Sequence, residues 1–112
     1  MDPDDLARLR RLLDDYARAD RRHAGLLAEI DELLTRALAD LIRPGIQPEE
    51  VRRALGDPHV VLGEESDERL DWLYPALPPA GTPADGMPWY VMLRFRNGTL
   101  ARAERRAWVE AR

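Results

Sequence analysis

The sequence contains no cysteine, no lysine and no apolar run of the length that a membrane-spanning helix needs. Without cysteine, the chain can form neither disulfide bonds nor thiolate metal sites, and catalysis by a thiol is excluded. All 17 basic residues are arginines, which we attribute to genomic base composition. The opening residues, 1–5, are acidic where a secretion signal is basic. We therefore expect a cytoplasmic protein.

The length and charge of the chain limit what it can be. A chain of 112 residues is long enough for one modest hydrophobic core and too short for two. Its net charge is −4, with acidic and basic residues interleaved. Such a balance favours neither nucleic acid nor an anionic membrane as a partner. We therefore expect one compact unit whose partners are proteins.

Residues 1–43 are predicted to form a helical arm. Between Asp4 and Arg43 there is no proline and a single glycine, and Pro44-Gly45 ends the segment. The apolar residues that recur at alternating steps of three and four, the spacing of a heptad seam, are Leu6, Leu9, Leu13, Tyr16, Leu27, Ile30, Leu34, Ala37 and Leu41. Such a stripe needs a cover, because exposing it to water is strongly unfavourable.

Two structures fit this arm, because Asp20 and His23 interrupt the seam with polar side chains. In the first, which we favour, the helix is continuous, ~60 Å long at about 1.5 Å per residue, and pairs with a second copy as a coiled-coil homodimer. In the second, residues 20–25 form the bend of a helical hairpin whose halves pack on each other. We interpret His23 as solvated or paired with Asp20 rather than as a catalytic or metal-binding residue.

Residues 46–58 have the features of a short helix with a defined start and end. Pro48 suits its first turn, and Gly56 followed by Pro58 ends it. Val51 and Leu55 share one face, which is therefore apolar.

After Gly56 the apolar period changes from nearly four to two, which indicates strands. We expect strands at 59–62, 69–74 and 89–96 and a last strand after the turn at Asn97-Gly98, which supplies the two positive-φ positions of a tight hairpin. Leu70, Trp72 and Tyr74 share the buried side of the second strand. The predicted class is α+β.

The register of this hairpin requires a bulge. Simple pairing of Phe95 with Leu100 would direct the charged residues of the last strand at the core. A bulge just after Leu100 instead turns Ala101, Ala103 and Ala107 inward, where small side chains would let a helix lie close to the sheet. In the alternative, the last strand overhangs the core as a twisted ribbon. The arginines that form a basic patch on the hairpin are Arg94, Arg96, Arg102, Arg105 and Arg106, and we interpret this patch as cross-strand pairing with the acidic segment 64–71.

Residues 75–88 form a long loop, because they include five prolines and two glycines in fourteen residues. A loop of this length in a small domain is a candidate recognition surface, and the helical arm is the other. The candidate protein-binding residues are Leu6, Leu13, Asp20 and His23 in the arm and Pro78, Pro79, Pro83 and Met87 in the loop.

Several short motifs in the second part of the chain form a set, in this order: Gly45-Ile46-Gln47, Val51, Leu55-Gly56-Asp57-Pro58, Trp72, Tyr74, Phe95 and Gly98. In order and spacing, residues 42–109 resemble the BamE-like family, the SmpA/OmlA domain of bacterial lipoproteins. The resemblance implies two helices on one face of a three-stranded antiparallel sheet and a protein-binding role without catalysis. The family's lipoprotein signal and lipid-bearing cysteine are missing here, and the arm is added. We expect the fold to carry over where the membrane assembly role does not.

We therefore predict a helical arm, 1–43, and a BamE-like α+β domain, 44–112. The long N-terminal helix, or helical hairpin, and the short helix would pack on a three- to four-stranded antiparallel sheet. The predicted function is that of a cytoplasmic protein-binding adaptor that uses the arm and the loop. The alternative is an inhibitor or immunity-type protein that blocks a partner enzyme. We expect no enzymatic activity, no cofactor and no metal, because the chain lacks a phosphate-binding glycine loop and Ser66 has no histidine nearby in the sequence.

Overall fold

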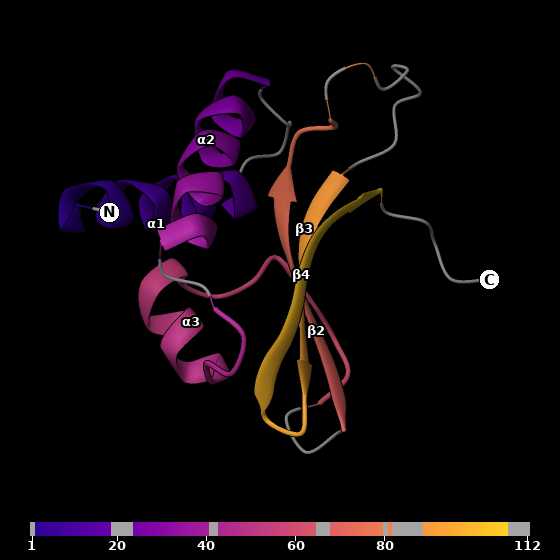
Figure 1. The fold of residues 1–112 in the computed structure, drawn as a ribbon. Coiled ribbons are helices and arrows are strands. Elements are labelled where there is room, and N and C mark those ends of the chain that lie inside the picture. Colours follow the sequence, from indigo (N-terminus) through magenta and orange to yellow (C-terminus); the bar gives the residue numbers. More distant parts are fainter. Residues whose placement is uncertain are drawn as a thin grey trace.

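The fold is α+β, as predicted. The computed structural model describes residues 2–18, 24–40, 43–64, 68–79, 81 and 89–107. The elements in these ranges are the helices α1 (Pro3–Arg18), α2 (Ala24–Asp40) and α3 (Pro48–Leu55) and the strands β1 (Val60–Leu62), β2 (Arg69–Ala76), β3 (Trp89–Arg96) and β4 (Thr99–Ala107). The strands form one antiparallel sheet in the order β1-β2-β3-β4, and the described helices lie on one side of it (Figure 1). None of these helices is long and apolar enough to cross a bilayer.

The N-terminal arm is two helices and not one, so the favoured continuous helix is wrong. Helix α1 ends at Arg18 and α2 begins at Ala24, and the two helices contact each other. A single helix over the arm would be ~60 Å long, whereas the longest dimension of the molecule is 40 Å. Of the predicted bend, residues 20–23 lie outside the described residues, and Ala24 and Gly25 belong to α2. The packed two-helix alternative is what the structure shows.

The apolar seam of the arm is covered within the chain. Leu9, Leu13 and Tyr16 of α1 are buried together with Ile30 and Leu34 of α2, in the same core as the sheet. The homodimer was predicted because a continuous helix would leave this stripe exposed unless a second copy covered it. The stripe is covered within one chain, so this reason for a homodimer no longer applies. A dimer through the N-terminal helix stays a prediction without this support.

Helix α3 follows the expected pattern. The backbone N–H of Gln47, at its N-cap, donates a 3.0 Å hydrogen bond to the Glu50 carboxylate, and Gly56 ends the helix with a φ of 83°. That φ is one that only glycine adopts easily. Val51 and Leu55 are fully buried. The short helix is therefore fixed to the sheet by its apolar face.

The hairpin of β3 and β4 contains both the predicted turn and the predicted bulge. Asn97 and Gly98 have φ angles of 51° and 85°, as a tight two-residue hairpin requires. The register shifts between the pairs Phe95–Leu100 and Arg94–Arg102. Ala101 is therefore the extra residue of the strand, directly after Leu100.

Two expectations about β4 are wrong. Ala101 and Ala103 are exposed, so no helix lies close over them. Arg105, assigned to the solvent-facing basic patch, instead pairs across the sheet with Val91 of the core-facing row and reaches α2, where its Nη1 donates a 2.6 Å hydrogen bond to Asp31. Part of the strand therefore has no helix packed over it.

The main core lies between the helices and one face of the sheet, which we call the helix-covered face. Its largest fully buried side chains are Trp72, Tyr74 and Phe95. The rings of Trp72 and Phe95 meet edge to face with centroids 5.1 Å apart, a favourable aromatic geometry. The predicted burial of Leu70, Trp72 and Tyr74 on one side of β2 is confirmed.

Candidate protein-binding face

The other face of the sheet, which we call the open face, has no described helix over it (Figure 1). Its residues follow from the register, because side chains of directly paired residues point to the same face. The open face comprises Val60 and Leu62 of β1, Arg69, Asp71, Leu73 and Pro75 of β2, Tyr90, Met92, Arg94 and Arg96 of β3, and Arg102, Glu104 and Arg106 of β4. Among the described strand residues, the charged side chains are concentrated on this face.

The centre of the open face is apolar. Leu73, Tyr90 and Met92 form a buried cluster separate from the main core, with Val60 packed against it. Leu62 at its margin is 43% exposed. A hollow of about 230 Å³ lies over this cluster. The open face therefore combines an apolar floor with a depression that a side chain of another molecule could enter.

A first group of charges, the Asp71 triad, consists of Asp71, Arg69 and Arg94. The Asp71 carboxylate is only 4% exposed. It accepts a 3.0 Å hydrogen bond from Nε of Arg94 on the neighbouring strand and a 3.1 Å hydrogen bond from Nη2 of Arg69 on its own strand. The predicted cross-strand pairing with segment 64–71 is confirmed for Arg94. The carboxylate is shared, so the triad keeps one net positive charge.

A second group, the Glu104 triad, consists of Glu104, Arg102 and Arg106. Glu104 pairs with Arg102 at 2.9 Å and with Arg106 at 3.3 Å. All three residues belong to β4, so here the pairing runs along one strand and not across two. This triad, too, has one more positive than negative charge.

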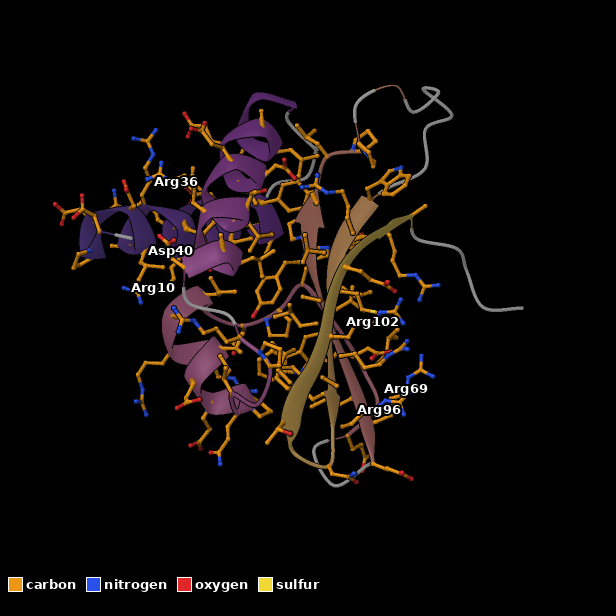
Figure 2. All side chains as sticks on the ribbon, in the orientation of Figure 1. Arg10, Arg36, Asp40, Arg69, Arg96 and Arg102 are labelled. Carbon is orange, nitrogen blue, oxygen red and sulfur yellow. The ribbon has the colours of Figure 1, made fainter. Side chains whose placement is uncertain are left out.

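The open face is positive in an acidic protein. Its five arginines and two carboxylates give a charge of +3, whereas the whole chain carries −4, so the other residues together carry −7. In Figure 2, Arg69, Arg96 and Arg102 project from the sheet on the side away from the helices. No ion pair is recorded for Arg96 with any described residue. The open face is therefore opposite in net charge to the rest of the chain.

Two of these arginines also lie against the apolar floor. Nη2 of Arg94 is 3.7 Å and Nη1 of Arg106 is 4.0 Å from the sulfur of Met92. Long arginine side chains commonly cover apolar surface with their stems while the guanidinium stays hydrated. The floor is therefore bordered by cationic groups that are close enough to act on anything bound there.

The predicted binding residues of the arm and the loop differ in how far they are buried. Leu13 is buried in the main core, and Leu6 is partly buried against it, so neither forms the expected free stripe. Pro78 and Pro79 are exposed just after β2. The other predicted residues, Asp20, His23, Pro83 and Met87, lie outside the described residues. Of the candidates that the structure describes, those of the arm belong to the core and those of the loop to the surface, so they do not form one site.

The start of the loop is held by Arg105 and Asp31. Nη1 of Arg105 donates a 2.6 Å hydrogen bond to the Leu77 carbonyl, and the Leu77 N–H donates a 3.1 Å hydrogen bond to the Asp31 carboxylate. Asp31 thus binds both the guanidinium and the backbone amide. The exposed Pro78 and Pro79 therefore follow directly after Leu77, whose backbone is held by these hydrogen bonds.

A second hollow, of about 240 Å³, lies where α1, α3 and the start of β1 meet, lined among others by Arg10, Asp57 and His59. His59 contacts Tyr16 edge to face, with ring centroids 5.6 Å apart, and stacks on Tyr90 at 6.1 Å. The side chains here join elements of the fold. Arg10 of α1, for example, donates a 2.9 Å hydrogen bond to the carbonyl of Arg53 in α3. Among the described residues, no three His, Asp or Glu side chains are grouped so as to hold a metal ion.

Near this hollow, Tyr74 joins β2 to the end of α3. Its hydroxyl donates a 2.9 Å hydrogen bond to the Gly56 carbonyl. Burial raises the pKa of the Tyr74 phenol well above its ordinary value, and the negative charge of Asp57 adds to this, while Arg52 opposes it. The group stays protonated, which suits a structural donor and not a general base.

The sequence reasoning missed the open face. Leu73 stands at an outward position of β2, whose inward positions were predicted correctly, and Tyr90 and Met92 stand at the outward positions of β3. Apolar residues at both sets of positions predict a strand that is buried on both faces. That signal could have identified the second apolar surface.

No protein-family model and no curated protein matches the sequence. The resemblance of residues 42–109 to the BamE-like family therefore stays a prediction.

Proposed function

We propose that this chain is a non-enzymatic protein-binding module, an adaptor, and that it binds its partner through the open face of the sheet. The observation that carries this proposal is the apolar floor of Leu73, Tyr90 and Met92 under a hollow, with no described helix over it. The arm contributes its leucines to the main core. The binding surface is therefore assigned to the sheet and not to the arm.

The composition of the open face supports this assignment. Tyrosine, methionine and arginine are enriched at protein–protein interfaces, and the centres of interfaces are more apolar than their rims. Here an apolar centre with Tyr90 and Met92 is bordered by arginines, which is the same arrangement. Leu62, exposed at the margin, would become buried on binding, and this adds to the favourable free energy of association.

The test compares two neighbouring residues that point to opposite faces of one strand. Leu62 belongs to the open face, whereas Val61, which pairs with Trp72, belongs to the helix-covered face and is similarly exposed, 49% against 43%. A photo-crosslinking amino acid is placed at each position in turn, and the protein is irradiated in its native host. We expect position 62 to crosslink to a distinct protein and position 61 to give little. Equal crosslinking from both positions, or none from position 62, would contradict the proposal.

A cytoplasmic location and a BamE-like relationship belong to the same proposal. The order α3, β2, β3 and β4 matches the order of elements that the resemblance implies. The present chain has one strand more than that pattern, the short β1 with its exposed Leu62. The added strand lies at the margin of the proposed binding face.

A second candidate is an inhibitor or immunity-type protein that inserts its loop into a partner enzyme. It is favoured by the anchoring of Leu77 through Arg105 and Asp31, because a preorganised loop loses less conformational entropy on binding. In this case replacement of residues 78–79 by Gly-Ser should abolish inhibition of the crosslinked enzyme. An adaptor would keep its partner with that replacement.

A further inference from the structure

We propose that the partner segment held by the open face is acidic: a stretch of another protein that places an apolar side chain in the hollow and carboxylates on the surrounding arginines. This inference rests on the proposed function and specifies the chemistry of the partner.

The open face differs in net charge from the rest of the chain. The open face has a net charge of +3 and the rest of the chain −7. Charge complementarity steers association and disfavours partners of the wrong sign. An acidic segment is attracted to this face and repelled by the remaining surface, so its approach is directed to the hollow.

The arginines of the open face also supply hydrogen-bond donors. Each guanidinium has five N–H donors. The side chains of Arg69, Arg102 and Arg106 are 57%, 60% and 56% exposed. Their recorded ion pairs use only part of those donors, so each has N–H groups left for a carboxylate of the partner. Paired N–H donors of arginine match the two oxygens of a carboxylate.

A second copy of the chain does not fit the open face as its partner. Two open faces would bring +3 against +3, and like charges across an interface cost free energy. The open face is therefore unsuited to a symmetric dimer.

Nucleic acid fits the face less well than an acidic protein does. Asp71 and Glu104 lie within the arginine cluster and would repel phosphates. Proteins that bind single strands offer exposed aromatic rings on which bases stack, whereas the open-face aromatic residue, Tyr90, is 6% exposed. An apolar floor suits an aliphatic side chain between carboxylates better than a row of bases.

The experiment uses a phage-displayed library of random peptides, selected on the full chain at low salt. We expect the selected peptides to be enriched in Asp and Glu around an apolar residue, and their affinity to fall as salt screens the charges. Their affinity should fall at least about tenfold for the double variant Arg69→Gln/Arg106→Gln, since two cationic contacts are lost. In this variant Asp71 keeps Arg94 and Glu104 keeps Arg102.

The matched control is Arg11→Gln/Arg53→Gln, which removes the same charge from exposed positions on α1 and α3. Affinity for this control should change less than about twofold. Equal losses in both double variants, or selected peptides no more acidic than the starting library, would overturn the inference. Tighter binding of a single-stranded oligonucleotide than of the selected peptides would overturn it as well, in favour of nucleic acid.

The experiment also separates this inference from the proposed function. If the selected peptides are not acidic but bind Leu62→Ser more weakly than the wild type, the open face is still the binding surface. Only the inference of an acidic partner is then contradicted. Peptides that bind Leu62→Ser and the double variant as tightly as the wild type would contradict both the proposed binding surface and the acidic partner. Thermal unfolding of each variant verifies that the fold is intact, and the salt dependence of wild-type binding tests the charge attraction without any substitution.

Discussion

The two faces of the sheet differ in how their apolar residues are covered. On the helix-covered face, Trp72, Leu93 and Phe95 are buried under helices in one large cluster. On the open face, Leu73 and Met92 are buried almost as fully. The groups that cover them there are arginine side chains and the carboxylates paired with those arginines. Similar burial is reached by helix packing on one side and by paired charges on the other.

This difference separates stability from recognition. Helix packing removes large apolar areas from water at roughly 25 cal/mol per Å², and a surface covered in this way is closed to partners. Side chains at a surface can be rearranged far more easily than a packed helix. The helix-covered face is therefore expected to determine stability and the open face to determine binding.

The largest expected effect is that of Trp72→Ala on the helix-covered face. Trp72 is 1% exposed and packs against Phe95, and loss of such a side chain costs about 3–5 kcal/mol. Chemical denaturation should show a loss of this size, enough to unfold much of a small domain. An unchanged free energy of unfolding would show that this face does not determine stability.

Asp71→Ala tests whether the open face also contributes to stability. The substitution leaves Arg94, whose side chain is 11% exposed, without its carboxylate, and removal of one partner of a buried pair costs about 3 kcal/mol. The double variant Asp71→Leu/Arg94→Met should recover most of this loss, because no uncompensated charge remains. Failure of the double variant to recover stability would show that the pair itself is stabilising.

Arg105→Met should cost about 2 kcal/mol, since hydrogen bonds to charged groups contribute about 1.5–3 kcal/mol. Arg105 crosses from β4 to the helix side of the sheet and binds both Asp31 and the Leu77 carbonyl. The control is Arg102→Met on the open face, whose exposed ion pair should contribute less than about 1 kcal/mol. Equal losses in denaturation experiments would contradict the difference between the two faces.

Tyr74→Phe should cost about 1 kcal/mol at neutral pH, through loss of the hydrogen bond to the Gly56 carbonyl. The pKa of Tyr74 is raised in the folded chain above its ordinary value of 10.0. Its contribution is therefore complete below about pH 10 and is lost as the pH rises further, because the unfolded chain ionises first. The variant should lose stability less steeply than the wild type in denaturation series above that pH.

The smallest effect on stability is expected for Leu62→Ser. Leu62 is 43% exposed, and substitutions at such surface positions usually change the free energy of unfolding by about 0.5 kcal/mol or less. Capture of the crosslinked partner should nevertheless fall strongly, while Val61→Ser should leave it unchanged. A large loss of stability in Leu62→Ser would show that this residue belongs to the fold and not to the binding surface.

Features with local chemical causes could be predicted from the sequence. The turn at Asn97-Gly98, the end of α3 at Gly56 and the bulge after Leu100 follow from backbone preferences and from the need to keep charges out of the core. The two options for the arm could not be separated, because Asp20 and His23 are compatible with both a helix and a bend. Sedimentation equilibrium still tests the predicted dimer, and a monomer mass would contradict it.

Features that depend on distant partners could not be predicted. Arg105 lies 74 residues from Asp31. The predicted bulge puts Arg105 on the same side of the strand as Ala103 and Ala107, but the local sequence does not show that Asp31 lies there to pair with it. The exposure of Ala103 depends on where the helices end over the sheet, which local sequence does not determine. The open face was accessible to prediction through its apolar outward residues but was not recognised.

Ala101 is one residue more in β4 than β3 can pair with, and it shifts the alternation of side chains between the two faces. Downstream of it, every side chain is on the opposite face from the one that uninterrupted pairing with β3 would give. Deletion of Ala101 would close the bulge and leave the two faces unchanged, because Arg102 would follow Leu100 directly and still lie opposite Arg94. If Ala101 were instead paired within the ladder, Arg105 would leave Asp31 for the open face, and the Glu104 triad would turn toward the helices. The bulge at one small residue, which makes no recorded polar contact among the described residues, thus keeps these arginines on one side of the protein.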